Sequence, residues 1–159
     1  MTHDPQAGTL PAFPCPAAPY LPHDPPMALI DRVLAFGEDH IQASAVLGTD
    51  AGFDDGQSVP SWVLIEYMAQ AVAAYAGLQA ALAGEPVRKG FLLGTRELSW
   101  TRARLPLGQT LRLSGRRLTQ GATGLVTFDC EAAIGDERIA AGRLNVYQPA
   151  DPDAYLAAQ

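Results

Sequence analysis

The chain has 159 residues, 48% of them hydrophobic, which is the length and composition of one ordinary domain with a real core. A formal net charge of −6 at pH 7 disfavours a general nucleic-acid surface, and the interrupted apolar stretch 62–82 is not expected to span a membrane. No secretory signal is visible, and two cysteines without metal or disulfide spacing favour the reducing cytoplasm.

Residues 1–26 are expected to form a proline-rich N-terminal arm. Seven prolines between residues 11 and 26 remove backbone donors and bias the preceding residues towards extended backbone, so no helix is predicted there. The rest of the chain divides into a folded domain, 27–148, and a C-terminal tail, 149–159, of short helix or disorder.

Two strands and a long helix are predicted after the arm. β-Rich runs at 27–36 and 40–47 are separated by Gly-Glu-Asp, a typical hairpin turn, and 51–60 has the composition of a loop. Ser61 is predicted to cap a helix that ends near Gly84. Because this helix is apolar around nearly its whole circumference, other parts of the protein have to enclose it.

The second half is predicted to consist of strands at 88–100, 109–118, 125–134 and 137–147, with turn signals between them. Two strands, one buried helix and four strands fit an α+β hotdog fold, in which a curved antiparallel sheet wraps around one long central helix. The sheet encloses most of such a helix and a second protomer covers the rest, so a homodimer or higher oligomer is expected.

Two stretches carry a family resemblance. Residues 21–33 read Leu-Pro-His-Asp-Pro-Pro-Met-Ala-Leu-Ile-Asp-Arg-Val, which resembles the Leu-Pro-His-Arg-x-Pro-Phe-Leu-Leu-(Ile/Val)-Asp-Arg-Val of the 3-hydroxyacyl-ACP dehydratases. Residues 60–70 read Pro-Ser-Trp-Val-Leu-Ile-Glu-Tyr-Met-Ala-Gln, which is similar to that family's Pro-Gly-Val-Leu-x-x-Glu-Ala-x-Ala-Gln. The branch associated with aryl-polyene and xanthomonadin-type pigment clusters looks most similar. The resemblance covers residues 20–147.

The resemblance implies dehydration of 3-hydroxyacyl-ACP to trans-2-enoyl-ACP in fatty acid or polyene biosynthesis, with no metal and no cofactor. A base takes the C2 proton and an acid protonates the departing C3 hydroxyl. In the relatives these are a histidine and a helix carboxylate from two subunits, and N–H groups at the helix start polarise the thioester carbonyl. Glu66 matches the carboxylate, and Ser61, Trp62 and Val63 match the substrate-binding helix start.

Glu66 also stands out by its surroundings, because an ionised carboxylate in an apolar helix is costly without partners. Such a group often has a catalytic role. The alternative is a carboxylate held by structural hydrogen bonds, with Gln70, one turn on, as its partner and a further substrate-binding candidate. The small residues Ala69, Ala73, Ala76 and Gly77 leave room for an acyl tunnel, although close packing explains them equally well.

The family's usual histidine is missing. Its segment before the helix reads Phe-Asp-Asp-Gly-Gln-Ser-Val-Pro here, at 53–60. His3 lies in the arm and His40 begins a strand at a position expected to be exposed, so His23 is the candidate for a relocated base. A paralogous partner subunit that supplies the histidine is the alternative.

Basic residues gather after the helix. Arg88, Lys89, Arg102 and Arg104 are candidates for binding an acidic acyl carrier protein and its phosphopantetheine phosphate, because arginine suits phosphate. The competing interpretation is a set of solvated strand faces. Asp31 and Arg32 are expected to fix neighbouring segments rather than to catalyse.

Three functions are therefore considered. The first is dehydration by Glu66 with His23 or a partner's histidine. The second is thioester hydrolysis on the same scaffold, with a carboxylate that activates water. The third is a non-catalytic or half-site hotdog subunit that partners a histidine-bearing paralogue.

Overall fold

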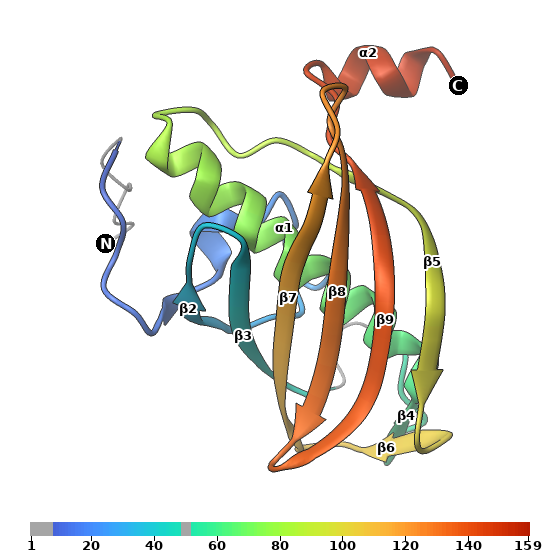
Figure 1. Ribbon diagram of the computed structural model, residues 1–159. Coiled ribbons are helices and arrows are strands. Elements are labelled where there is room, and N and C mark those ends of the chain that lie inside the picture. Colours follow the sequence, from blue (N-terminus) through green and yellow to red (C-terminus); the bar gives the residue numbers. More distant parts are fainter. Residues whose placement is uncertain (1–7, 49–51) are drawn as a thin grey trace.

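A large antiparallel sheet curves around one long helix, α1 (Leu64–Leu82), in the computed structural model, which describes residues 8–48 and 52–159 (Figure 1). The sheet has the order β1-β2-β3-β7-β8-β9-β5. Its strands are β1 (Cys15–Pro16), β2 (Arg32–Phe36), β3 (His40–Val46), β5 (Phe91–Trp100), β7 (Thr110–Gln120), β8 (Leu125–Ile134) and β9 (Glu137–Tyr147). The predicted hotdog fold is confirmed.

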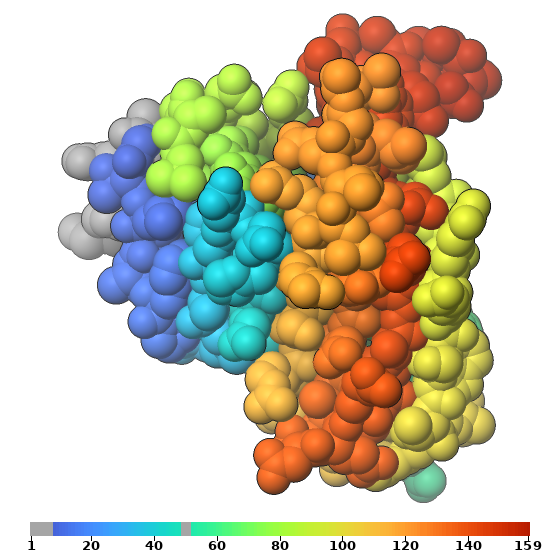
Figure 2. Space-filling view, viewed as in Figure 1, coloured from blue at the N-terminus to red at the C-terminus, as the bar shows by residue number. Residues whose placement is uncertain are grey.

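Smaller elements complete the chain. A second sheet of two strands pairs β4 (Ser58–Pro60) with β6 (Arg104–Pro106), beside the start of the central helix. The predicted tail contains a helix, α2 (Pro152–Ala157), whose Asp151 cap accepts a hydrogen bond from the Ala154 N–H. This helix projects beyond the end of the sheet, as the space-filling view of the outer face shows (Figure 2).

The helix begins differently from the prediction. Residues Ser61–Val63 form a 3-10 turn, η2, before the α-helix, and the N-cap position belongs to Pro60. Ser61 is therefore not a cap: its N–H donates to the Ala103 carbonyl at 2.9 Å, and its buried hydroxyl has no hydrogen-bond partner among the described residues. Proline at 60 supplies the extended backbone that the helix start needs without using a side-chain cap.

Part of the proline-rich segment packs into the fold. A 3-10 turn, η1 (Ala18–Tyr20), follows β1, so the prediction that this segment contains no helix was wrong there. Pro19 stands in the first turn, where its missing N–H costs nothing. Ala17 and Tyr20 are buried against the domain.

β2, the strand predicted at residues 27–36, is shorter than expected. β2 begins at Arg32, and part of the predicted strand bonds to the helix instead of the sheet: the Leu29 N–H donates to the Gln70 side chain, which also donates to the Met27 carbonyl. Asp31 and Arg32 each fix a neighbouring segment, since Asp31 accepts the Val46 N–H at 2.8 Å and Arg32 donates to the Pro14 carbonyl.

The core lies between the helix and the inner sheet face. Met68, Leu78, Leu113 and Phe128 are among its fully buried side chains. Both cysteines belong to it, and burial raises the pKa of the Cys15 thiol and raises that of Cys130 to about 12. No helix within residues 8–48 and 52–159 has the length and apolarity needed to cross a membrane.

One side of the helix stays uncovered in the single chain. Ala69, Ala73 and Ala76 are half-buried, whereas Ala71, Ala74 and Leu78 on other faces are buried. The expectation that the helix is enclosed all round is therefore met everywhere except along this alanine stripe.

Gly77 holds the arm against the helix, and this gives a first prediction. A Cβ at Gly77 would lie 2.0 Å from the Tyr20 carbonyl oxygen, so η1 can approach only a glycine. Gly77→Ala should lower the free energy of unfolding by about 1–3 kcal/mol, as overpacking does, despite alanine's better helix propensity.

Urea unfolding followed by circular dichroism measures this. Gly94→Ala is the control, because a Cβ there meets no atom within 4 Å, and it should stay within about 0.5 kcal/mol of the wild type. A Gly77→Ala protein as stable as the wild type would show that η1 is not held in this way.

Candidate active site

The structure brings the two predicted catalytic residues together in one chain. His23 lies in the loop between η1 and β2, and Glu66 lies in the first turn of α1. The His23 Nε2 is 3.9 Å from the Glu66 Oε1, and the two side chains are 30% and 36% exposed. The pair therefore stands at a rim, partly shielded from water, and not on an open surface.

Gln70 connects this pair to the loop. Its side chain is fully buried, donates to the Met27 carbonyl at 2.7 Å and to the Glu66 Oε1 at 3.1 Å, and accepts the Leu29 N–H at 2.7 Å. The predicted pairing of Gln70 with Glu66 is thus confirmed. Both amide hydrogens of Gln70 are used within the protein, so its amide has no hydrogen left to donate to a substrate. Gln70 positions Glu66 instead.

The orientation of His23 leaves one nitrogen for chemistry. Its Nδ1 is buried and finds no hydrogen-bond partner in the described part of the chain, whereas Nε2 faces the carboxylate. A proton on Nε2 is attracted by Glu66, so the two groups can exchange a proton once a substrate or a small movement closes the 3.9 Å gap.

An apolar cavity of about 170 Å³ opens beside the pair. Its floor is the alanine stripe of the helix, Ala69, Ala73 and Ala76, and its far wall comes from β5 and β9, where Phe91 and Tyr147 line it. Tyr155 of α2 packs on both rings, with centroids 4.9 and 5.1 Å away. Three of the four small residues thus line a cavity, while Gly77 serves packing.

The arrangement suits removal of two groups from one face of a chain. In a syn elimination the departing C2 hydrogen and C3 hydroxyl lie on the same side of the carbon–carbon bond, so the base and the acid have to be neighbours. A histidine and a carboxylate 3.9 Å apart on one cavity wall meet that requirement.

The predicted substrate-binding residues at the helix start do not form an open site in the single chain. The Ser61 N–H already bonds to Ala103, and Val63 is buried, so neither resembles an open carbonyl site in the single chain. Trp62 is 52% exposed and packs edge-on against Phe53 at 5.9 Å between ring centroids. None of these three helix-start residues lines the 170 Å³ cavity.

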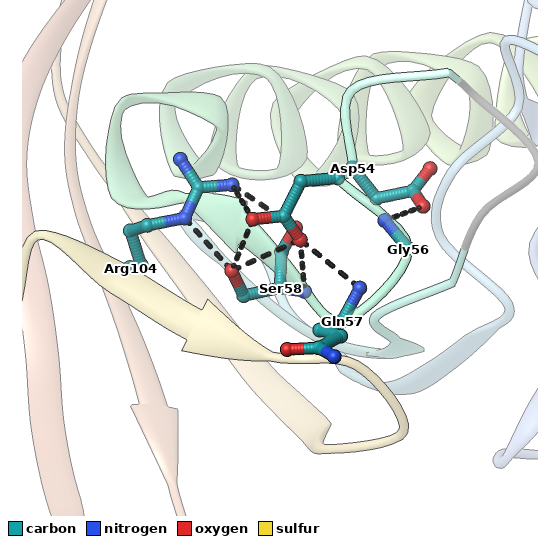
Figure 3. A network of polar contacts seen from close by, with 6 residues as sticks. Asp54, Gly56, Gln57, Ser58 and Arg104 are labelled. Atoms are coloured by element: carbon teal, nitrogen blue, oxygen red, sulfur yellow. Dashed lines mark hydrogen bonds and ion pairs between the residues drawn. The ribbon is translucent and has the colours of Figure 1, made fainter.

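A rigid turn occupies the place of the missing histidine (Figure 3). The Asp55 Oδ1 accepts the N–H groups of Gln57 and Ser58, at 3.0 and 2.8 Å. These two backbone hydrogen bonds, with help from the Arg104 guanidinium and the Ser58 hydroxyl, hold the pKa of Asp55 below its usual value. Arg104 also donates from Nε to the Ser58 hydroxyl at 2.7 Å.

The four candidate carrier-binding residues do not form one patch. Arg88 precedes β5, and Arg102 and Arg104 follow it, so they lie near opposite ends of a ten-residue strand (Figure 1). Arg88 pairs with Glu85 at 3.4 Å, Arg102 with Glu137, and Arg104 with Asp55 at 3.2 Å. Lys89 is exposed beside Arg88.

His40, the other histidine in the described part of the chain, lies outside the site. His40 begins β3 and is exposed beside Asp39, at 3.6 Å, as predicted, and His3 lies outside the described residues. No group of three or more histidine, cysteine or acidic side chains within 8–48 and 52–159 is arranged to hold a metal ion. Phe91 and Tyr147 line the cavity but were not predicted as site residues. The signal available in the sequence was an aromatic residue at the start of β5 and another at the end of β9.

Comparisons with known proteins identify a family. A family model described as ApeP dehydratase matches residues 15–157. The chain is similar to the dehydratase heterocomplex ApeI:P from Xenorhabdus doucetiae, with 28% identity over 91% of this chain and 98% of the other and a TM-score of 0.82.

More distant structures share the fold alone. A hypothetical thioesterase with coenzyme A from Streptococcus pneumoniae is 12% identical, with coverage of 73% of this chain and 83% of that one and a TM-score of 0.56. An uncharacterized protein from Pyrococcus horikoshii is 14% identical, with coverage of 88% and 97% and a TM-score of 0.60. None of the curated proteins matches this chain.

The turn at Asp55 gives a second prediction. Because its folded-state pKa is lowered, the carboxylate stabilises the fold above the usual aspartate pKa of about 4, and this contribution is lost as the pH falls through the lowered value. The urea concentration at the midpoint of unfolding should therefore fall less steeply in Asp55→Asn than in the wild type as the pH is lowered from about 5 to about 2.

The readout is urea unfolding at each pH. Arg104→Gln keeps the two backbone hydrogen bonds and should reduce the slope less than Asp55→Asn does. Identical slopes for Asp55→Asn and the wild type would show that this turn does not contribute to acid sensitivity.

Proposed function

The chain belongs to the ApeP-like dehydratase family, whose model matches residues 15–157, and from this we propose that it takes part in dehydrating 3-hydroxyacyl-ACP to trans-2-enoyl-ACP. The observation that supports this most directly is the His23–Glu66 pair at 3.9 Å on the wall of an apolar cavity. Fatty acid or polyene biosynthesis is the setting that the resemblance suggests.

The proposed reaction needs one proton to be taken and one to be given. The His23 Nε2 accepts the C2 proton, the C2–H electron pair forms the C2–C3 double bond, and the C3–O bond breaks. Glu66 in its protonated form supplies the proton with which the hydroxyl leaves as water. Proton return from the imidazolium to the carboxylate then restores the pair without a metal or a cofactor.

A partner subunit is the second part of the proposal. Within residues 8–48 and 52–159, β5 is an edge strand whose only neighbour in the sheet is β9, and its Leu93 and Trp100 are 54% and 44% exposed. An unpaired edge with apolar side chains is a typical site for adding another chain's strand. The similar ApeI:P structure is a heterocomplex, which favours a paralogous hotdog subunit as the partner.

The carrier protein is proposed to dock near the helix start. Arg102 and Arg104 flank Ala103, whose carbonyl binds the first residue of η2, so they stand nearest the place where the relatives bind the thioester carbonyl. Their exposed ion pairs with Glu137 and Asp55 are weak enough for an acidic carrier to replace. Arg88 and Lys89 lie beyond the other end of β5, where Arg88 lines the same cavity as His23 and Glu66.

A half-site subunit is the competing function, because the family's usual histidine segment is absent. In that case Glu66 and the cavity come from this chain and the histidine from its partner. Thioester hydrolysis has weaker support, since the thioesterase neighbour shares the fold alone.

Single substitutions at the pair test the reaction, and this is the third prediction. In the complex with its paralogue, Glu66→Gln and His23→Gln should each lower kcat for enoyl product by about 10²–10⁴, the usual contribution of one acid or base. Enoyl absorbance measures the product, and a thiol reagent detects hydrolysis.

The outcomes separate the alternatives. Loss with Glu66→Gln but not with His23→Gln would assign the histidine to the partner. Unchanged rates for both would exclude this pair, and thiol release without enoyl absorbance would favour the hydrolase. His40→Gln is the matched control and should be silent, since His40 lies in β3 away from the cavity.

Binding through β5 gives the fourth prediction. Leu93→Glu should weaken association with the paralogue at least tenfold, because a buried unpaired carboxylate is costly at an interface. Size-exclusion chromatography with light scattering measures the complex. Val46→Glu is the control, equally exposed at 51% but in the interior strand β3, and equal losses for both variants would place the interface elsewhere.

A further inference from the structure

Tyr155 joins the C-terminal helix α2 to the sheet. None of the six residues of α2 is buried, and the half-buried ring of Tyr155 packs with its centroid 4.9 Å from that of Phe91 and 5.1 Å from that of Tyr147. A helix this short is not stable in water without such packing. The place of α2 beyond the end of β9 therefore depends on this aromatic contact (Figure 1).

The two rings that Tyr155 contacts form one wall of the 170 Å³ cavity. Phe91 is the first residue of β5, Tyr147 is the last residue of β9, and the two are register partners. Because the ladder of hydrogen bonds ends here, the sheet alone holds these rings less firmly than side chains in the middle of a strand. Tyr155 itself does not line the cavity, so it acts on the cavity through the two rings.

The backbone beside these rings is fixed separately, by Gln148. Its N–H donates to the Gly124 carbonyl at 3.1 Å, and its side-chain Nε2 donates to the Arg88 carbonyl, also at 3.1 Å. The end of β9 is thereby tied to the turn before β8 and to the segment before β5. Since these two bonds do not involve α2, a change at Tyr155 should leave the strands in place and loosen the rings.

The start of α2 is defined by its own contacts. Asp151 accepts the Ala154 N–H at 3.0 Å, and Pro152 stands in the first turn, which is the arrangement of a capped helix. The cap orders the turn that carries Tyr155. Rings from three elements, β5, β9 and α2, therefore pack together at the cavity wall.

We propose that Tyr155 is a positioning residue: through Phe91 and Tyr147 it fixes the aromatic wall of the cavity and so sets the affinity for the substrate. His23 and Glu66 line the same cavity, whereas Tyr155 lies outside that lining. Its loss should therefore weaken binding and leave the proton transfers unchanged. The kinetic form of this inference rests on the proposed dehydration.

The experiment measures dehydration of a 3-hydroxyacyl carrier substrate by the complex of this chain with its paralogue. Tyr155→Ala should raise KM about two- to tenfold, the factor that an aromatic pair contributes to an equilibrium constant, and leave kcat within about twofold of the wild type. Tyr155→Phe keeps the ring and should have the wild-type KM. Asp151→Ala removes the cap without changing a ring, so it should raise KM less than Tyr155→Ala does.

A second readout does not need the reaction. N-Phenyl-1-naphthylamine, a dye that fluoresces in apolar sites, should bind Tyr155→Ala about two- to tenfold more weakly than the wild type. The signal that Ala73→Leu removes by filling the cavity floor is the part compared. Leu156→Ala is the matched control on the same helix, 48% exposed, and it should change neither KM nor dye affinity.

The outcomes distinguish the two proposals. A wild-type complex that forms no enoyl product would contradict the proposed function, and the dye then still tests Tyr155. A Tyr155→Ala protein with unchanged KM and unchanged dye affinity overturns the positioning role. A fall in kcat at constant KM overturns it as well, because a loss of correctly folded protein lowers the rate without weakening binding.

Discussion

The buried amide of Gln70 is the contact on which the rest of the site depends. One side chain accepts the Leu29 N–H, donates to the Met27 carbonyl and donates to Glu66. The Gln70 side chain is fully buried, so its amide would be costly to leave unpaired. The amide therefore fixes the loop that carries His23 and, at the same time, the carboxylate that faces it. Two of these hydrogen bonds join the helix to a loop that is distant in sequence, and the third lies within the helix.

The alanine stripe of the helix lies beside two features, a cavity and the free edge of β5. The alanine stripe is too small to fill the space beneath β5 and β9, so the 170 Å³ cavity remains there. The edge of β5 beside this cavity is open to another strand. A subunit that paired with the edge of β5 would cover this cavity together with the exposed side chains of Leu93 and Trp100.

Turn chemistry and periodicity were sufficient for most of the fold. β8 and β9 have the predicted bounds, because Gly135-Asp136 permits few alternatives between two alternating runs. The Ala18–Tyr20 turn and the true role of Ser61 were not predictable, since each depends on a tertiary contact, with Gly77 in one case and Ala103 in the other. The motif identified Glu66, and the spacing predicted its bond to Gln70. No spacing rule, however, places His23 beside a residue 43 positions later.

The state of the two cysteines bears on the proposed function, whose product is an enoyl thioester. Such products are electrophiles at C3 and alkylate free thiolates by conjugate addition. Cys15 and Cys130 are buried, and with pKa values raised by burial, that of Cys130 to about 12, both stay protonated at neutral pH. Neither cysteine would therefore offer the proposed product a nucleophilic thiolate, a protection that comes directly from core packing.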